Sequence, residues 1–263
     1  MTHSSSRRNF VKASSTITAG TLLSSPFIAK AAKDNSVIKV GLVGIGGRGS
    51  GAAAQAMNAD PNVALTAIGD LFEDRVKLRS RILKARGRDK YQVTEETTFI
   101  GFDAYKKVID SGVDVVILTT PPAFRPQHLE YAVEKGVHCF FEKPVAVDAP
   151  GVRKVIELAK KAKAKNLNFM SGFCWRHHNP KKEVFGRILD GSLGNLNAMY
   201  STYNGGEVWK KKREDGWSDF EAQTRNWNAH LWLSGDSIVE QAYRYDAMGN
   251  GRSFTYSCRR LWR

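Results

Sequence analysis

The sequence is short of cysteine and of long apolar runs, and each shortage excludes a class of protein. Its three cysteines, Cys139, Cys174 and Cys258, are odd in number, widely spaced and form no CxxC pair. A disulfide framework or a zinc-binding cysteine pair is therefore not expected. The longest apolar stretch, residues 17–29, is broken by Thr, Ser and Pro. It is shorter than the roughly 20 residues needed to cross a bilayer, so we predict no stable membrane anchor.

Acidic residues are scarce at the two ends of the chain, and this scarcity explains much of the net charge of +14. Residues 1–31 contain four basic residues and no acid, and residues 243–263 contain five arginines against Asp246. The 263 residues are otherwise 42% hydrophobic and 25% charged, which suits one large or two modest globular domains. Because the basic residues do not gather on the folded body, we predict no nucleic-acid partner.

The first 31 residues have the order of an export signal. Arg7 and Arg8 are followed by Phe10, then by the mild apolar region, and then by the A-x-A sequence of residues 29–31. This order resembles a twin-arginine signal, which implies the twin-arginine export machinery as a partner and a bacterial periplasmic location. We expect cleavage after Ala31. A disordered basic tail is the alternative.

From residue 37 onward, short β-branched runs alternate with helical patterns, as in βαβ units. The strands are expected at residues 37–43, 64–68, 113–118, 137–141 and 168–170. The helices are expected at residues 50–58, 72–85, 105–111, 125–135 and 150–165. This alternation predicts an α/β domain over residues 32–172, with a doubly wound parallel sheet.

A glycine-rich turn, G-x-G-x-x-G, directly follows the first strand and opens an alanine-rich helix. Glycine permits the tight turn and lets backbone amides approach a pyrophosphate at the helix N-terminus. The pattern alone is weak, because a glycine turn often has only a structural reason, but the flanking strand and helix are in register. We predict that this turn binds a dinucleotide through Gly44, Ile45, Gly46, Gly47, Arg48 and Gly49.

Asp70 lies at the end of the second predicted strand, where an acid can bind the adenosine ribose. Its carboxylate would repel the additional phosphate of NADP, so we expect NAD to be the preferred cofactor. The alternative is that Asp70 only caps the helix expected at residues 72–85.

Two further motifs follow the fourth and fifth predicted strands, at the edge where open α/β sheets bind ligands. The first contains Thr119, Thr120 and Pro121, and the second contains Glu142 and Lys143. A lysine at this edge can transfer a proton if burial and the positive nicotinamide lower its pKa. Lys143 could equally be a surface loop residue.

Together the glycine turn, Asp70, the T-T-P-P of residues 119–122 and the E-K-P-V-A-V-D of residues 142–148 resemble the glucose-fructose oxidoreductase / inositol dehydrogenase / rhizopine catabolism (Gfo/Idh/MocA) family. The resemblance covers about residues 37–242. It implies a Rossmann domain followed by an α+β domain, and NAD(P)-dependent oxidation of a sugar or polyol hydroxyl. By position it implies cofactor contacts from the glycine turn, Asp70, Thr119, Thr120, Pro121, Glu142 and Lys143, with Lys143 as the catalytic residue.

The expected second domain, residues 173–242, begins with a segment that resembles the family's R-x-x-x-P element, Arg176 to Pro180. Aromatic and amide side chains suit the two sides of a sugar ring. We therefore assign substrate binding to Arg176, Tyr203, Asn204 and Trp227, with tryptophans that are simply core as the alternative. The adjacent histidines 177 and 178 lack a suitably spaced further ligand, so we predict no metal.

The resulting hypothesis is an NAD-dependent oxidoreductase that acts on a sugar or cyclitol; a homo-oligomer is compatible with it. An exported enzyme must hold and regenerate its cofactor, which an NAD-dependent glycosidase of the same family also does. The third hypothesis is a non-catalytic nucleotide-binding remnant. It arises because the family continues after Ala242 with V-H-x-x-D, whereas this chain reads Tyr243-Arg244-Tyr245-Asp246. We expect residues 243–263 to be a frameshifted tail without strand or helix periodicity, and the α+β domain to be incomplete.

Overall fold

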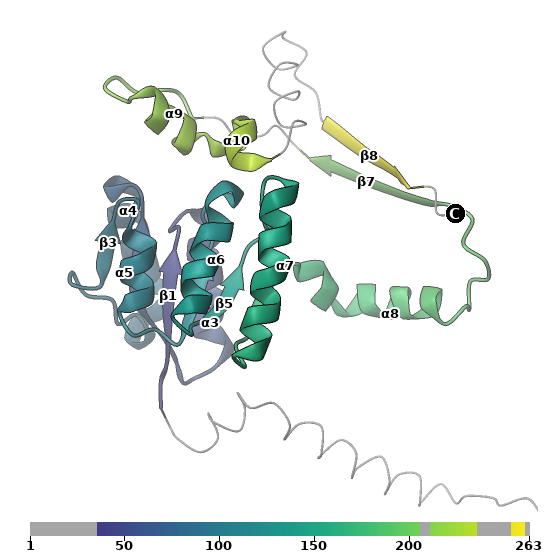
Figure 1. The fold of residues 1–263 in the computed structure, drawn as a ribbon, viewed down its shortest axis with the longest axis horizontal. Helices are drawn as coiled ribbons and strands as arrows, with labels where there is room; N and C mark the ends of the chain where they lie inside the picture. The colour runs from purple at the N-terminus through teal and green to yellow at the C-terminus, as the bar shows by residue number, and fades with distance from the viewer. Residues whose placement is uncertain (1–35, 206–210, 236–253, 261–263) are drawn as a thin grey trace, which may run out of the picture.

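The computed structural model describes residues 36–205, 211–235 and 254–260 (Figure 1). The predicted export signal and its cleavage site lie outside these ranges, as do residues 243–253 of the expected tail. Within the described ranges, no helix combines the length and the apolar character that crossing a membrane requires.

Six parallel strands form the central sheet, in the order β3-β2-β1-β4-β5-β6 (Figure 1). Their bounds are β1 Ile38–Val43, β2 Val63–Asp70, β3 Thr98–Ile100, β4 Val115–Leu118, β5 His138–Phe141 and β6 Phe169–Ser171. Because β4 pairs with β1, the chain crosses over after β3 and continues outward on the other side. This reversal of direction is the topological switch point of a doubly wound sheet.

Helices cover both faces of the sheet, as its almost wholly apolar strands require. One face packs against α3 (Gly47–Ala59) and α4 (Glu73–Gly87) through a buried cluster that includes Met57 and Leu83. The other face packs against α5 (Ala104–Asp110), α6 (Arg125–Glu134) and α7 (Ala149–Ala164) through a cluster that includes Leu129 and Leu158. Two short 3-10 turns, η1 (Arg88–Lys90) and η2 (Pro122–Phe124), join these elements.

The predicted fold class is confirmed, and each strand and helix expected between residues 37 and 165 is present within a few residues. β3 was not predicted. It has only three residues and lies at the edge of the sheet, so it carries too little sequence pattern to be recognised.

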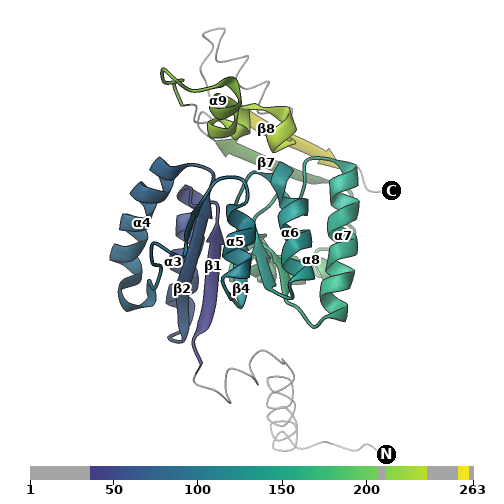
Figure 2. The same cartoon turned by 60° about the vertical axis from the view of Figure 1, so that its left-hand side comes forward.

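Beyond β6 the chain forms η3 (Cys174–His177), α8 (Asn179–Leu189), β7 (Met199–Gly205), α9 (Asp219–Arg225), η4 (Trp227–Ala229), α10 (Leu231–Ser234) and β8 (Phe254–Arg260). Figures 1 and 2 both show α9 over one end of the parallel sheet, and Figure 1 shows α8 extending away from the sheet. β7 and β8 pair antiparallel, with Met199 opposite Arg260. The expectation of a tail without strand periodicity is therefore wrong over residues 254–260, where F-T-Y-S-C alternates apolar and polar residues.

Candidate functional site

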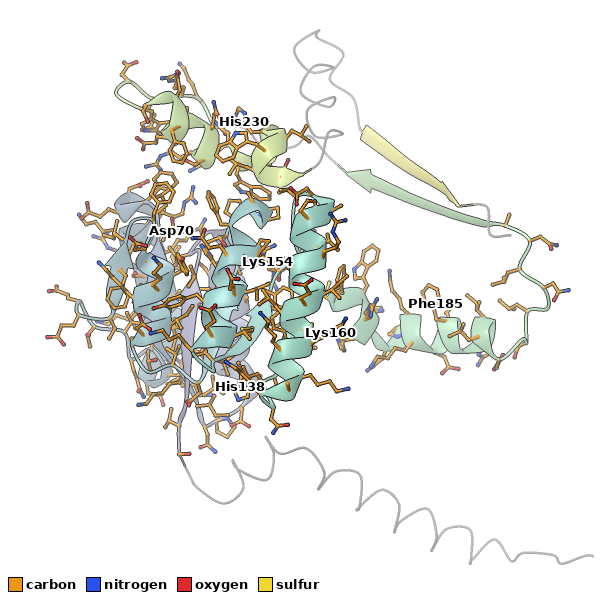
Figure 3. The ribbon with its side chains drawn as sticks, in the orientation of Figure 1. Asp70, His138, Lys154, Lys160, Phe185 and His230 are labelled. Carbon is orange, nitrogen blue, oxygen red and sulfur yellow. The ribbon has the colours of Figure 1, made fainter. Side chains whose placement is uncertain are left out.

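A cavity of about 510 Å³ lies at the carboxyl ends of the parallel strands, between the sheet and the segment that contains α9. Figure 3 places Asp70 at the end of the sheet that faces α9, and His138 at the opposite end. Most of the predicted cofactor residues line the cavity: Gly44, Gly46, Gly47, Arg48, Gly49, Asp70, Thr119, Thr120 and Pro121. The structure thus brings together residues from the ends of β1, β2 and β4.

The glycine turn is held tightly against β2 and β4. Gly44 has φ +89°, and its N–H donates to the Gly69 carbonyl at 2.8 Å. The Thr119 hydroxyl donates to the carbonyls of Val43 and Gly44. No side chain caps the N-terminus of α3, and its first turn carries no acid. This positive helix end, with room above Gly46 for a close approach, fits the pyrophosphate of a dinucleotide.

Asp70 connects the glycine turn to the start of α4. Its carboxylate accepts hydrogen bonds from the N–H groups of Ile45 at 2.8 Å and Phe72 at 3.1 Å. Burial raises the pKa of this carboxyl, while Arg75 and the backbone donors oppose the rise. Asp70 therefore lines the cavity, as the ribose assignment needs. It also orders the turn before α4, but it does not cap that helix, whose N-cap residue is Phe72 without a side-chain cap.

Glu142 contacts Arg48 of the glycine turn but is not among the residues that line the cavity. It is 7% exposed, and its carboxylate accepts a 2.6 Å hydrogen bond from Nε of Arg48. A side chain at Gly172 would press against the same carboxylate. Glu142 thus fixes the position of Arg48, and its predicted cofactor contact would pass through that arginine.

Arg125 ties together the two loops that follow β4 and β5. Arg125 is 1% exposed, and its guanidinium donates to the backbone carbonyls of Thr120 and Pro144. Burial lowers the pKa of Arg125 to about 10, although the nearby Glu142 opposes the shift. Its charge is accommodated by the two loop carbonyls, so the loops that carry the predicted cofactor and catalytic residues are held in one arrangement.

His128 stacks on Tyr105, with ring centroids 4.0 Å apart, and its Nδ1 lies 3.3 Å from the Thr120 hydroxyl. Burial, with a contribution from Arg125, lowers the pKa of His128 to about 3. The unfolded chain, where histidine titrates near 6.5, therefore binds a proton more readily than the folded chain. The stability contributed by neutral His128 is complete above pH 6.5 and is lost as the pH falls toward 3.

We expect the free energy of unfolding to fall between pH 7.5 and pH 5 by about 2 kcal/mol more in the wild type than in His128→Phe. Phenylalanine keeps the ring stack and removes the titrating group. Urea denaturation at the two pH values measures the difference, and His178→Phe, at an exposed position, is the matched control. Equal pH slopes in the wild type and His128→Phe would contradict the assigned protonation state.

The remaining predicted site residues do not gather in one place. Lys143, two residues after β5, is exposed and is not among the residues that line the cavity, so the burial expected of it is not present. Arg176 is exposed, with its guanidinium 5.6 Å from the centre of the Phe173 ring. The Ile45 side chain is fully buried in the core. Trp227, assigned above to substrate, instead lines the cavity that contains Asp70. Tyr203 and Asn204 belong to β7, but their side chains lie outside the described part of the structure.

Several residues that line the cavity were not predicted. They are Phe72, Asp74, Arg75, Arg79, Phe102, Tyr105, Phe124, His128, Lys211 and Thr224, among others. Arg75 and Arg79 lie four residues apart on α4, the helix that follows Asp70, so their shared helix face was an available signal. Lys211 and Thr224 come from far along the chain and carried no such signal.

In the described ranges, no group of three or more His, Cys, Asp or Glu side chains is arranged to hold a metal ion. Cys139 and Cys174 are both free thiols. Burial raises the pKa of the Cys139 thiol to about 12, which makes it inert as a nucleophile.

Comparison with known proteins identifies the domain that contains the glycine turn. The family model described as "Oxidoreductase family, NAD-binding Rossmann fold" matches residues 38–170. Inositol 2-dehydrogenase 4 from Saccharopolyspora erythraea is 27% identical, over 80% of this chain and 58% of its own length. A glycosyl hydrolase family 109 protein from Solibacter usitatus is 24% identical, over 75% of this chain and 45% of its own.

Solved structures share the fold. Scyllo-inositol dehydrogenase from Lactobacillus casei, with bound cofactor NAD(H) and scyllo-inositol, matches with a TM-score of 0.52 and 21% identity. The match covers 65% of this chain and 46% of that protein. The chain thus spans about half the length of these relatives.

Proposed function

Because the chain belongs to the oxidoreductase family with an NAD-binding Rossmann fold, we propose that it binds NAD and oxidises a hydroxyl group of a sugar or cyclitol. The observation that carries this proposal is the convergence of the glycine turn, Asp70 and Thr119–Pro121 on one cavity. The names of its relatives, an inositol dehydrogenase among them, support the substrate class.

The glycine turn, Asp70 and Thr119 would hold NAD, which would supply the acceptor for a hydride from the carbon that bears the hydroxyl. The proton of that hydroxyl would leave at the same time, and we assign Lys143, after β5, to accept it as the neutral amine. Because Lys143 is exposed, this role requires the bound cofactor and substrate to cover it and exclude water. Arg125 supports this role because it holds the Pro144 carbonyl, one residue from Lys143. The products are the ketone, the reduced cofactor and a proton.

Asp70→Ala is expected to weaken NAD binding about tenfold or more, because a charge-assisted hydrogen bond to a ribose hydroxyl contributes roughly 1.5–3 kcal/mol. The affinity gap between NAD and NADP should narrow at the same time, since the carboxylate that repels the additional phosphate is gone. Titration calorimetry with both cofactors measures the two effects.

Glu73→Gln is the matched control for Asp70→Ala, because Glu73 lies three residues away on α4 and pairs with Lys77 at an exposed site. Thermal melting of each variant reports on the turn that Asp70 also organises. Unchanged affinity of Asp70→Ala for both cofactors would remove Asp70 from the site and leave it a residue that only orders the turn before α4.

A glycosidase that uses NAD transiently is the second candidate, favoured by the family 109 glycosyl hydrolases among the relatives. Such an enzyme oxidises the sugar ring, eliminates the glycosidic substituent and then reduces the ring again. Analysis of the products separates the two candidates, because only the hydrolase leaves the total oxidation state of the sugar unchanged.

Export through the twin-arginine machinery to the periplasm is also part of the proposal, supported by Arg7, Arg8 and the A-x-A at residues 29–31. A folded exported enzyme would carry its cofactor with it. Mass spectrometry of the denatured, purified mature protein tests both points: it should show a dinucleotide and a chain that begins at Ala32.

A further inference from the structure

The cavity has a second wall that lies outside the stretch matched by the family model. Lys211, Thr224 and Trp227 line the cavity from the segment that contains α9 and η4. They face the side that carries Asp70 and Phe72, where the adenosine of a dinucleotide would lie. A cofactor in this cavity would therefore contact two parts of the chain.

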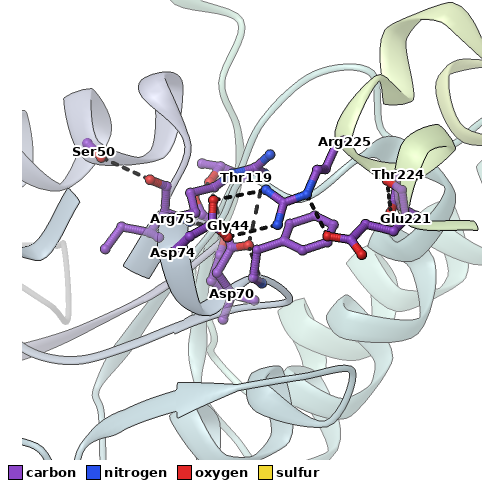
Figure 4. A network of polar contacts seen from close by, with 12 residues as sticks. Gly44, Ser50, Asp70, Asp74, Arg75, Thr119, Glu221, Thr224 and Arg225 are labelled. Carbon is purple, nitrogen blue, oxygen red and sulfur yellow. Dashed lines mark hydrogen bonds and ion pairs between the residues drawn. The ribbon is translucent and has the colours of Figure 1, made fainter. Parts of the chain in front are cut away.

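Arg225, the last residue of α9, joins this wall to the Rossmann domain (Figure 4). Its Nη1 and Nη2 donate to the two carboxylate oxygens of Asp74, at 3.0 and 2.9 Å. Its Nε donates to Glu221 at 2.8 Å. The Arg225 side chain is 9% exposed, although that of Asp74 is 65% exposed.

Two aromatic rings also contact this guanidinium. Its central carbon lies 4.0 Å from the centre of the Phe72 ring and 4.7 Å from that of Trp217. Phe72 and Asp74 are two and four residues after Asp70, so Arg225 is anchored beside the predicted ribose site. An arginine that makes two parallel hydrogen bonds and stacks on aromatic rings is held in one orientation, unlike an arginine in an exposed surface ion pair. We call this contact between Arg225 and Asp74 the joint.

Asn226, the residue after Arg225, connects the end of α9 to the backbone of Lys211. The buried Asn226 amide accepts from the Lys211 N–H at 2.7 Å and donates to the Lys211 carbonyl at 3.1 Å. Burial lowers the pKa of Lys211, and the charges of Arg75 and Arg225 lower it further. The carboxylates of Asp74 and Glu214 oppose this lowering.

We infer that Arg225 is a positioning residue for the cofactor: through Asp74 it holds Lys211, Thr224 and Trp227 against the adenosine end of the cavity. The inference rests on the proposed function. Its consequence is kinetic, since a dinucleotide held between the two walls leaves only when the joint between Arg225 and Asp74 opens. Slow release would suit an enzyme that regenerates one bound cofactor.

Stopped-flow measurement of NADH release tests the inference, with energy transfer from protein tryptophan to NADH as the signal. Arg225→Gln and Asp74→Asn should each raise the dissociation rate about tenfold and change the association rate far less, as is usual when a contact is lost from one binding site. Asp74→Asn changes only an exposed carboxylate, so it tests the joint without removing the buried arginine.

Arg187→Gln is the matched control for Arg225→Gln, because Arg187 pairs with Glu183 at an exposed site on α8 and contacts neither Asp74 nor Arg225. Release from Asp74→Asn and Arg225→Gln at the wild-type rate, or equal acceleration in Arg187→Gln, would overturn the positioning role. A wild-type chain that binds no NADH would instead overturn the proposed function.

Discussion

Gly49→Ala is expected to lower the free energy of unfolding by about 3 kcal/mol, because the added methyl group has no space and the backbone around it is fixed by hydrogen bonds. A Cβ at this position would overlap the Gly44 carbonyl oxygen and lie 2.5 Å from the Thr119 hydroxyl oxygen. Both neighbours are anchored, since the N–H of Gly44 donates to Gly69 and that of Thr119 donates to Val43. Urea denaturation measures the loss, and NADH binding should disappear with the displaced turn.

Gly46→Ala is the control that separates folding from binding. Gly46 has φ −64°, which any residue adopts, and a Cβ there would have no atom within 4 Å. We expect the stability to change by less than about 1 kcal/mol, the usual size of an unstrained glycine substitution. The added methyl group would stand where a pyrophosphate approaches the backbone, so NADH affinity should still fall about tenfold or more. Equal stability losses in the two variants would contradict the different roles assigned to these glycines.

Lys143→Met is expected to lower sugar- or cyclitol-dependent reduction of NAD by about 10²- to 10⁴-fold, the contribution typical of a general acid–base residue. NAD affinity should stay within about twofold, because the lysine acts on the hydroxyl proton and not on the phosphates. The measurements are the steady-state kcat and the cofactor Kd of the same preparation.

Lys154→Met is the matched control for Lys143→Met, since Lys154 pairs with Glu130 at an exposed site on α7. It should leave both the turnover and the NAD affinity unchanged. Full turnover in Lys143→Met would remove this residue from the chemistry, and a large loss of NAD affinity would make it a cofactor-binding residue instead.

The central sheet and the glycine turn were predictable because their signals are local. Except for the three-residue edge strand β3, each strand is a short apolar run and each helix has its own period, so neighbours in the sequence were sufficient to place them. The G-x-G-x-x-G turn and Asp70 were recognisable for the same reason, as they lie in one βαβ unit. The family resemblance added Lys143, whose residue type and position alone did not distinguish it from a surface lysine.

What the sequence by itself determined, then, is the Rossmann domain and the edge of it that can bind a dinucleotide. Only the tertiary structure decided how that edge is held. Arg48 meets Glu142 across 94 residues, and Arg225 meets Asp74 across 151. Arg125 lies buried between two loop carbonyls although an arginine in the sequence suggests the surface. Such pairs form only when folding brings remote segments together and removes water from between them, so no local pattern encodes them.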